Sequence, residues 1–187
     1  MAPLRARRAA GLRFRAVNDV DLLREAIALA VDSASTIGGP FGALVALDGR
    51  VIGRGANRVV AENDPTLHAE VVAIREACAT VGSFDLTGAV LYASCEPCPM
   101  CFGAAWWARV DRIVHAASRA DAAGAGFDDA AIYADVSLPA DQRTLATVQL
   151  LAEDGWQPKS SAPIRSWSSA VTRQAASASM LSVTERS

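Results

Sequence analysis

The sequence predicts an α/β fold in which helices pack on the faces of one sheet, and three observations lead to it. The 187 residues are enough for about one domain with a sizeable core. Apolar residues make up 51% of the chain and charged residues 20%, which is typical of a globular domain. Helical and strand patterns follow one another in the order helix, hairpin, helix, strand, helix, strand.

The chain begins with an amphipathic helix and a β-hairpin. Residues 19–35 place apolar side chains at helical spacing behind a capping Asp19. Residues 38–57 contain two short β-rich runs on either side of Asp48 and Gly49, a pair typical of a two-residue hairpin turn.

The rest of the domain alternates strands with helices. Residues 63–82 have a capped start and a helical pattern that ends at Gly82. The segments that follow are a buried strand, a helix with proline in its first turn, a second strand, a glycine loop leading into a short helix, and a last strand or helix: residues 88–94, 97–109, 111–117, 123–135 and 144–150. Two of these helices start just after a loop or a strand end, where open α/β sheets place their ligand sites.

Charge and hydropathy exclude several classes of protein. The formal net charge of −2 gives no general attraction to nucleic acid or to membrane surfaces. No apolar run approaches the roughly 20 residues that a membrane-spanning helix needs. Three of the four cysteines are clustered and Cys78 is remote, unlike a secreted disulfide framework. We therefore expect a cytoplasmic protein that binds neither a membrane nor nucleic acid.

The two ends differ in composition from the middle. Residues 1–17 carry five arginines and no acidic residue, so we expect a loosely docked extension, with a transit peptide or a nucleic-acid arm as alternatives. Residues 158–187 are rich in Ser and Ala, with Trp167 as their one large aromatic anchor, and we expect a tail there. The domain itself is expected over residues 18–157.

Cys95, Cys98 and Cys101 form two overlapping C-x-x-C pairs in "CEPCPMC", a stretch that fits several chemistries. A bacterial ferredoxin cluster would continue with a fourth cysteine, but Ala105 stands there. A disulfide between Cys95 and Cys98 would be strained next to Pro97 and has no oxidising context. A metal site that draws a further ligand from elsewhere in the chain is the better interpretation.

That further ligand stands about thirty residues upstream, in "HAE". Catalytic zinc sites use three protein ligands and leave a fourth position for water. Cys98 and Cys101, three residues apart at a helix start, can present two thiolates on one face, and the helix N-terminus favours the thiolate form. His68 completes the three ligands, and Glu70 is free to carry protons beside a zinc-bound water. Cys95 is then left as a small buried residue.

Together, "HAEVVAIREA" (68–77) and "SCEPCPMC" (94–101) contain H-x-E and P-C-x-x-C, the signature of zinc deaminases. From residue 19 to about residue 156 the chain resembles the cytidine deaminase-like superfamily, in the branch of tRNA adenosine, cytosine and guanine deaminases. The resemblance implies a three-layer α/β/α fold with a central mixed five-stranded sheet. It also implies one catalytic Zn²⁺ per chain, held by the histidine and the two cysteines.

Further stretches resemble bacterial guanine deaminases in particular: "GGPFGA" (38–43), "NDPT" (63–66), "CPMCFGAAWWAR" (98–109) and "AGFDD" (125–129). The resemblance implies that Asn57 hydrogen-bonds the base, Phe41 lines its face and Trp107 closes the pocket. It also places Ala69 in the pocket. Asp129 would be both a catalytic and a substrate-binding residue, facing the ring amide or the departing amino group.

The implied reaction is hydrolysis of guanine to xanthine and ammonia. Zinc hydroxide would attack C2 while Glu70 moves a proton to the ring nitrogen and then to the leaving ammonia. Guanine offers N1–H and a 2-amino group, which an ionised carboxylate can accept, and a fixed carboxylate would repel phosphate. Local roles stay as alternatives: Asp128 and Asp129 can cap the helix that follows, and Asn57 can close the hairpin as a turn residue.

Assembly and substrate have alternatives as well. The resemblance implies a homodimer whose C-terminal tail is swapped so that it brings a tyrosine over the partner's active site. "APIRSW" (162–167) resembles the segment leading there, but no tyrosine follows, so Trp167 or another tail residue would close the pocket. Guanosine, cytidine or cytosine would suit a shorter lid. A tRNA adenosine deaminase would need a basic surface, and a non-catalytic zinc domain usually has four protein ligands.

Overall fold

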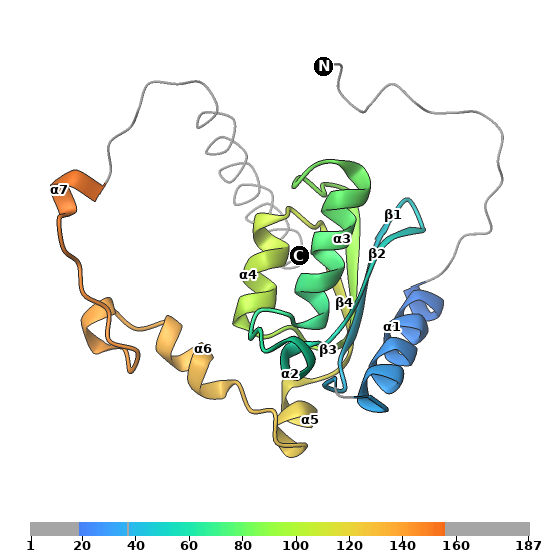
Figure 1. The fold of residues 1–187 in the computed structure, drawn as a ribbon, viewed down its shortest axis with the longest axis horizontal. Coiled ribbons are helices and arrows are strands. Elements are labelled where there is room, and N and C mark those ends of the chain that lie inside the picture. Colours follow the sequence, from blue (N-terminus) through green and yellow to red (C-terminus); the bar gives the residue numbers. More distant parts are fainter. Residues whose placement is uncertain (1–18, 37, 156–187) are drawn as a thin grey trace, which may run out of the picture.

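The computed structural model describes residues 19–36 and 38–155, which form a sheet with helices on both faces (Figure 1). The predictions for residues 1–17 and 158–187, with Trp167, lie outside the described residues. In chain order the elements are α1 (Asp19–Ala34), β1 (Gly42–Leu47), β2 (Arg50–Ala56), α2 (Val59–Glu62), α3 (Ala69–Val81), β3 (Ala89–Cys95), α4 (Pro99–Trp107), β4 (Arg112–Ala117), α5 (Arg119–Gly124), α6 (Ala130–Val136), the 3₁₀ turn Ala140–Gln142 and α7 (Ala152–Gly155).

The sheet is mixed, as expected, and its strands lie in the order β2-β1-β3-β4. Strand β1 is antiparallel to both β2 and β3, whereas β3 and β4 are parallel. The predicted hairpin turn is confirmed: Asp48 and Gly49 both have positive φ, 50° and 74°, as a two-residue turn of the primed type requires.

The central strands are buried on both faces. Ala43 and Val45 of β1 belong to the core cluster that contains α3, and Leu44 and Ala46 belong to the cluster that contains α1. Figure 1 shows α3 and α4 on one face of the sheet and α1 on the other. Strands covered on both faces carry nearly continuous apolar runs rather than alternating ones, which explains the pattern over 88–94.

The sheet has four strands in the described residues, so the expectation of a fifth strand is wrong for this part of the chain. The segment with the required pattern, residues 144–150, forms neither helix nor strand. Its large side chains stay in solvent: Leu145 is 78% exposed and Leu150 79%. Beyond α6 the chain extends away from the sheet (Figure 1), so among the described residues this segment lies beside no strand edge with which it could pair.

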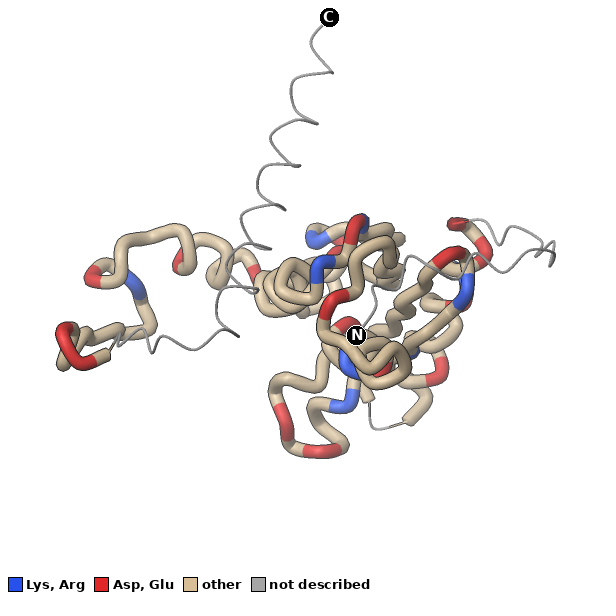
Figure 2. Tube along the Cα trace, turned by 90° about the horizontal axis from the view of Figure 1, so that it is seen from above, with Lys and Arg blue, Asp and Glu red and all other residues tan. Residues whose placement is uncertain are grey.

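Charged residues of both signs are interspersed over the described chain (Figure 2). Several pair across elements: Arg54 lies 2.8 Å from Glu25, and Arg112 lies 2.7 Å from Asp19. In the portion of the chain that the structure describes, no helix is both long enough and apolar enough to span a membrane.

Candidate active site

Two helix N-termini bring the predicted metal ligands together. His68 is the N-cap residue of α3 and Cys98 is the N-cap residue of α4, where Pro99 occupies the first turn. Neither side chain makes a capping hydrogen bond, so both remain available as ligands. Cys101 lies one turn into α4 and is fully buried. The positive ends of the two helix dipoles therefore converge on the two sulfur atoms and favour their thiolate forms.

The spacing of the three ligand atoms fits a tetrahedral zinc ion. Cys98 Sγ lies 3.6 Å from Cys101 Sγ, and His68 Nδ1 lies 3.6 Å from Cys98 Sγ and 3.5 Å from Cys101 Sγ. Zn–S bonds of about 2.3 Å and Zn–N bonds of about 2.05 Å at tetrahedral angles would place the sulfurs about 3.8 Å apart and S and N about 3.6 Å apart. The residues present therefore fit the ion without rearrangement.

The electrostatics of the cluster also suit a cation. The hydrogen bond with Cys101 and the neighbouring His68 lower the pKa of the Cys98 thiol to about 4, against the opposing effect of burial. The same contact with Cys98, together with burial, raises the pKa of Cys101. The hydrogen bond with Cys98 raises the pKa of His68. Negative charge thus gathers on Cys98, next to a second sulfur that a metal would deprotonate.

Glu70 lies beside the three ligands and is not one of them. Its side chain is buried, with 8% of the residue exposed, and its Oε2 accepts a hydrogen bond from Cys101 Sγ at 3.4 Å. Burial raises the pKa of Glu70 above its usual value. A carboxyl whose pKa is moved toward neutrality can both take up and release a proton, which is the requirement for a proton carrier.

Cys95 lies outside the cluster, at the end of β3. Its Sγ donates to the carbonyl oxygen of Ser118 at 3.7 Å, and burial raises the pKa of the thiol. All four cysteines are free, so no disulfide competes with metal binding.

Asn57 has a defined amide orientation. Its Oδ1 accepts from the backbone N–H of Gly39 at 3.3 Å and from that of Val59 at 3.2 Å. This pattern identifies the oxygen end of the amide and leaves the NH₂ group as the end that can donate to a ligand. Ala69, the first residue of α3, is fully buried beside His68.

The two aspartates of "AGFDD" have different roles. Asp128 Oδ1 accepts from the backbone N–H of Ala130 at 2.9 Å, the contact of a helix cap. Asp129 occupies the N-cap position of α6, but its carboxylate makes no capping hydrogen bond. Its Oδ1 instead lies 3.3 Å from Nε of Arg119. Sequence reasoning missed Arg119 and Tyr133, which lies under the Arg119 guanidinium, because no local pattern links residues this far apart.

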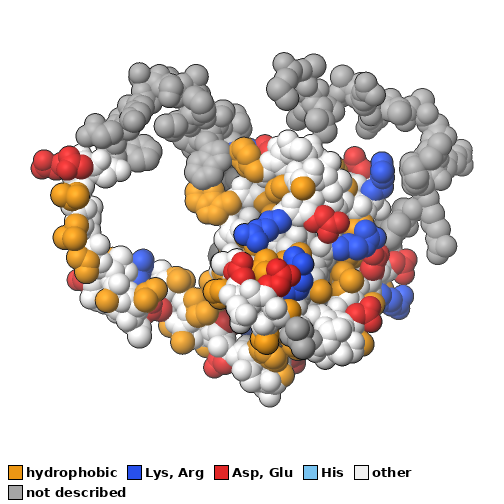
Figure 3. Space-filling view, viewed as in Figure 1, with side chains coloured by type: hydrophobic (Ala, Val, Ile, Leu, Met, Phe, Trp, Pro, Cys, Tyr) orange, Lys and Arg blue, Asp and Glu red, His pale blue; other side chains and the backbone are white. Residues whose placement is uncertain are grey.

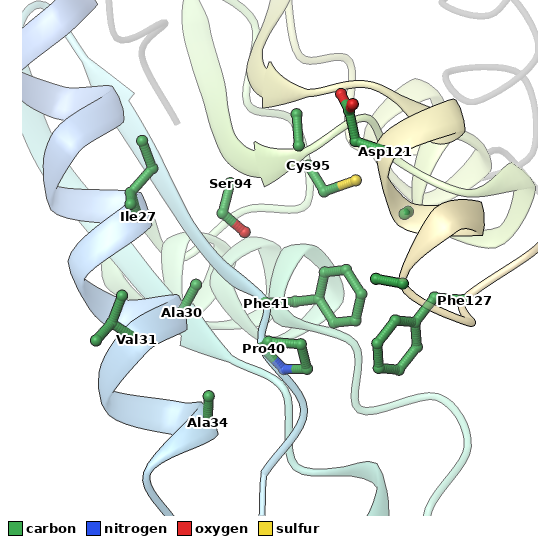
Figure 4. Close-up of a pocket in the computed structure, with 13 residues that line it drawn as sticks. Ile27, Ala30, Val31, Ala34, Pro40, Phe41, Ser94, Cys95, Asp121 and Phe127 are labelled. Carbon is green, nitrogen blue, oxygen red and sulfur yellow. The ribbon is translucent and has the colours of Figure 1, made fainter.

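Aromatic residues border a cavity of about 410 Å³ between α1, β3 and α5 (Figure 4). Phe41 and Phe127 meet edge to face there, with ring centroids 5.0 Å apart, so the "AGFDD" loop contacts the start of β1. Ser94, Cys95 and Asp121 also line the cavity, whereas the three metal ligands do not. Trp107, the last residue of α4, is half exposed in the single chain.

Comparisons with known proteins agree with this geometry. Residues 17–117 match the model of the cytidine and deoxycytidylate deaminase zinc-binding region. The guanine deaminase of Bacillus subtilis is 46% identical over 143 residues, which cover 76% of this chain and 92% of that protein. Its X-ray structure superposes with a TM-score of 0.70 at 44% identity, covering 82% of this chain and 95% of that one.

Two further relatives match a smaller share of the chain. The guanine deaminase structure from Nitrosomonas europaea has a TM-score of 0.58 at 32% identity, over 63% of this chain and 68% of that one. The tRNA-specific adenosine deaminase of Agrobacterium fabrum is 49% identical over 78 residues, 42% of this chain and 51% of that protein. The motifs, the three-ligand cluster and the matched region agree, and the chain belongs to the cytidine and deoxycytidylate deaminase zinc-binding family, with His68, Cys98 and Cys101 as the residues that can hold the zinc.

Proposed function

We propose that the protein hydrolyses guanine to xanthine and ammonia. One observation carries the hydrolytic part: the buried carboxyl of Glu70 lies beside a cluster with three ligating side chains in the described residues. Structural zinc sites usually have four protein ligands, whereas catalytic sites have three and an open position. The guanine deaminase of Bacillus subtilis, which matches most of the chain in sequence and in structure, supports guanine as the amine.

The chain's own residues can carry the protons of this reaction. A zinc ion bound to the three ligands would lower the pKa of a bound water to about 7. Glu70 takes the proton that the water loses as its oxygen bonds to C2 of guanine. Glu70 gives this proton to the ring nitrogen, then takes a second proton from the hydroxyl now on C2 and gives it to the amino group, which leaves as ammonia when its bond to C2 breaks. The proximity of Glu70 to Cys101 supports this role.

Asn57 and Asp129 would recognise opposite edges of the base. The Asn57 amide presents a donor, because its oxygen is occupied by backbone N–H groups, and guanine carries the acceptors O6 and N7. The carboxylate of Asp129 presents an acceptor for N1–H and the 2-amino group. Phe41 would line the face of the ring, and Trp107 would close the pocket, with Ala69 packed at its base. An analogue without these donors would leave Asp129 unpaired and bind poorly.

We also propose a homodimer in which the segment beyond α6 lies on the partner. Residues 144–151 form neither helix nor strand and expose Leu145, Val148, Leu150 and Leu151, and apolar side chains line this arm in Figure 3. β4, at the edge of the sheet, offers unpaired backbone groups to an added strand. A second copy can therefore supply the fifth strand that the single chain lacks. Light scattering should give the mass of a dimer, and Leu145→Ser with Val148→Ser should give monomers; a wild-type monomer would contradict the exchange.

The remaining proposals concern the boundaries of the domain, the segments that flank it and the location of the protein in the cell. We propose a domain over residues 18–157 that follows an arginine-rich extension over residues 1–17, and the start of the family match at residue 17 supports the boundary between the two. Residues 158–187 would form the tail that covers the partner's site. Four free cysteines support a reducing, cytoplasmic location, because zinc thiolates require reduced sulfur.

The test is ammonia release by the zinc-loaded protein with guanine, guanosine, cytosine and adenine offered separately. We expect xanthine from guanine and little product from the others. Glu70→Gln, which keeps the size of the side chain, should retain the fold and the zinc but lose turnover. Turnover of another amine would keep the hydrolysis and overturn guanine as substrate. Zinc binding without activity on any amine would make this a non-catalytic zinc domain.

A further inference from the structure

We propose that Arg119 is a positioning residue, which holds the Asp129 carboxylate in one orientation relative to the metal loop, residues 95–98. The inference rests on the proposed function, in which Asp129 accepts hydrogen bonds from the base. Arg119 touches neither the metal ligands nor the proposed base edge. Its effect would pass through Asp129, and its backbone and side chain are both tied to the metal loop.

The backbone at the start of α5 is attached to this loop by two hydrogen bonds, one at Arg119 and one at Ala117. Its N–H donates to Oε2 of Glu96 at 3.1 Å. The N–H of Glu96 in turn donates to the carbonyl oxygen of Ala117 at 2.9 Å. The first residue of α5 therefore has a fixed place beside the residues that precede Cys98.

The side chain of Arg119 is supported by Tyr133 of α6. The guanidinium carbon lies 3.7 Å from the centroid of the Tyr133 ring, a cation–π contact. The hydroxyl of Tyr133 donates to the carbonyl oxygen of Pro97 at 2.9 Å. Because Pro97 directly precedes the ligand Cys98, this hydrogen bond ties the aromatic support to the stretch of backbone that carries the metal ligand.

Arg119 then occupies one side of the Asp129 carboxylate. Its Nε lies 3.3 Å from Oδ1, and the two side chains are 36% and 19% exposed. Among the described residues, no other hydrogen bond to this carboxylate is found, and the helix cap is formed by Asp128 instead. Oδ2 of Asp129 is left to accept a hydrogen bond from a base, and the rigid guanidinium helps to fix the plane of the carboxylate.

The geometry predicts an effect on substrate binding rather than on stability. An ion pair this exposed contributes little to folding, but a carboxylate freed from it can rotate away from the base. We expect Arg119→Met to raise the KM for guanine about tenfold while kcat changes less than about threefold, since the lost contact acts on binding. Arg119→Lys, which keeps the charge but not the planar group, should give an intermediate KM.

Arg54→Met is the matched control. Arg54 forms an ion pair with Glu25 between β2 and α1, at 2.8 Å, and has no contact with the metal loop. It should leave KM unchanged and keep the zinc content of wild type. Tyr133→Phe keeps the ring under the guanidinium and removes the bond to Pro97, so it should raise KM two- to threefold and add nothing to the effect of Arg119→Met.

Active wild-type enzyme with an Arg119→Met variant of unchanged KM would overturn the inference and leave the proposed function intact. An equal change in KM for Arg54→Met would overturn it as well, because the effect would then not be specific to Asp129. If wild type converts another amine, the same comparison of KM is made with that amine. If wild type converts none, the proposed function fails and the inference fails with it, a result visible before any variant is made.

Discussion

Gly55 lies on β2 where the strand packs against the start of α3. Replacing it by alanine should displace the first turn of α3 and so distort the metal site. A Cβ at Gly55 would lie 1.9 Å from the carbonyl oxygen of Ala69 and 2.6 Å from the backbone nitrogen of Ala73. Real Cβ atoms essentially never come closer than 3.0 Å, so the first turn of α3 must retreat by about 1.1 Å. The atoms that the new Cβ would meet belong to the backbone, so no side-chain rotation can relieve the clash.

The displaced turn carries two residues of the site. His68 directly precedes Ala69, and Glu70 directly follows it. Metal–ligand distances tolerate changes of about 0.2 Å, roughly a fifth of the required movement. We therefore expect Gly55→Ala to weaken zinc binding at least about tenfold, in the range of mutations that misorient a ligand. Overpacking of this kind should also lower the free energy of unfolding by about 1–3 kcal/mol.

Two other glycines provide controls. At Gly53 a Cβ would lie 2.2 Å from the carbonyl oxygen of Ala73, one turn farther from the ligands, so Gly53→Ala should destabilise the fold with a smaller loss of zinc affinity. At Gly103 in α4 a Cβ would meet nothing within 4 Å, so Gly103→Ala should be neutral or stabilising. Competition with a chromogenic zinc chelator measures affinity, and thermal unfolding measures stability. A folded Gly55→Ala protein that binds zinc as tightly as Gly53→Ala would refute the reasoning.

Three further predictions follow from the same contacts. Cys98→Ser should lose zinc and turnover, whereas Cys95→Ser should keep both, as metal analysis of the purified variants will show. Removing zinc with a chelator should lower the Tm, because metal binding contributes to the stability of the folded state, and added zinc should restore it. Hydrogen bonds from Arg112 and Tyr92 lower the pKa of Asp19 to about 2. A carboxyl whose pKa is lower in the folded state than its ordinary value of 3.8 stabilises the fold at pH values above 3.8. This contribution is lost as the pH falls through about 2. Asp19→Asn should therefore lower the Tm at pH 7, with a difference from wild type that shrinks toward pH 2.

Local patterns located the metal site because each half of it is local. His68 and Glu70 are two residues apart, and Cys98 and Cys101 are three apart, so the start of a helix fixes each pair before any long-range packing is known. Only the approach of α3 to α4 is non-local, and the zinc chemistry of the residues was enough to predict it. The contact between Arg119 and Tyr133 has no such local sign.

The prediction of a fifth strand failed for a related physical reason. A strand exists only with a partner edge, and the apolar pattern of residues 144–150 says nothing about which chain provides that edge. The roles of Asp128 and Asp129 were also hard to predict, because they too depend on structure that the local sequence does not determine. Asp129 occupies the N-cap position with φ −109° and ψ 8°, outside the extended region usual for a capping side chain, while Asp128 supplies the capping contact. Sequence could not choose between adjacent aspartates, because the choice depends on a backbone angle.

The structural role of Asn57 need not compete with its proposed role in binding the base. As a turn residue it accepts two backbone hydrogen bonds through Oδ1, from Gly39 and Val59. Those bonds prevent the amide from flipping, so the same contacts determine that the NH₂ group is the end a ligand can meet. A freely rotating amide could offer either a donor or an acceptor and would discriminate poorly between bases. The turn at the end of β2 therefore gives Asn57 the fixed polarity that the proposed recognition of an acceptor edge requires.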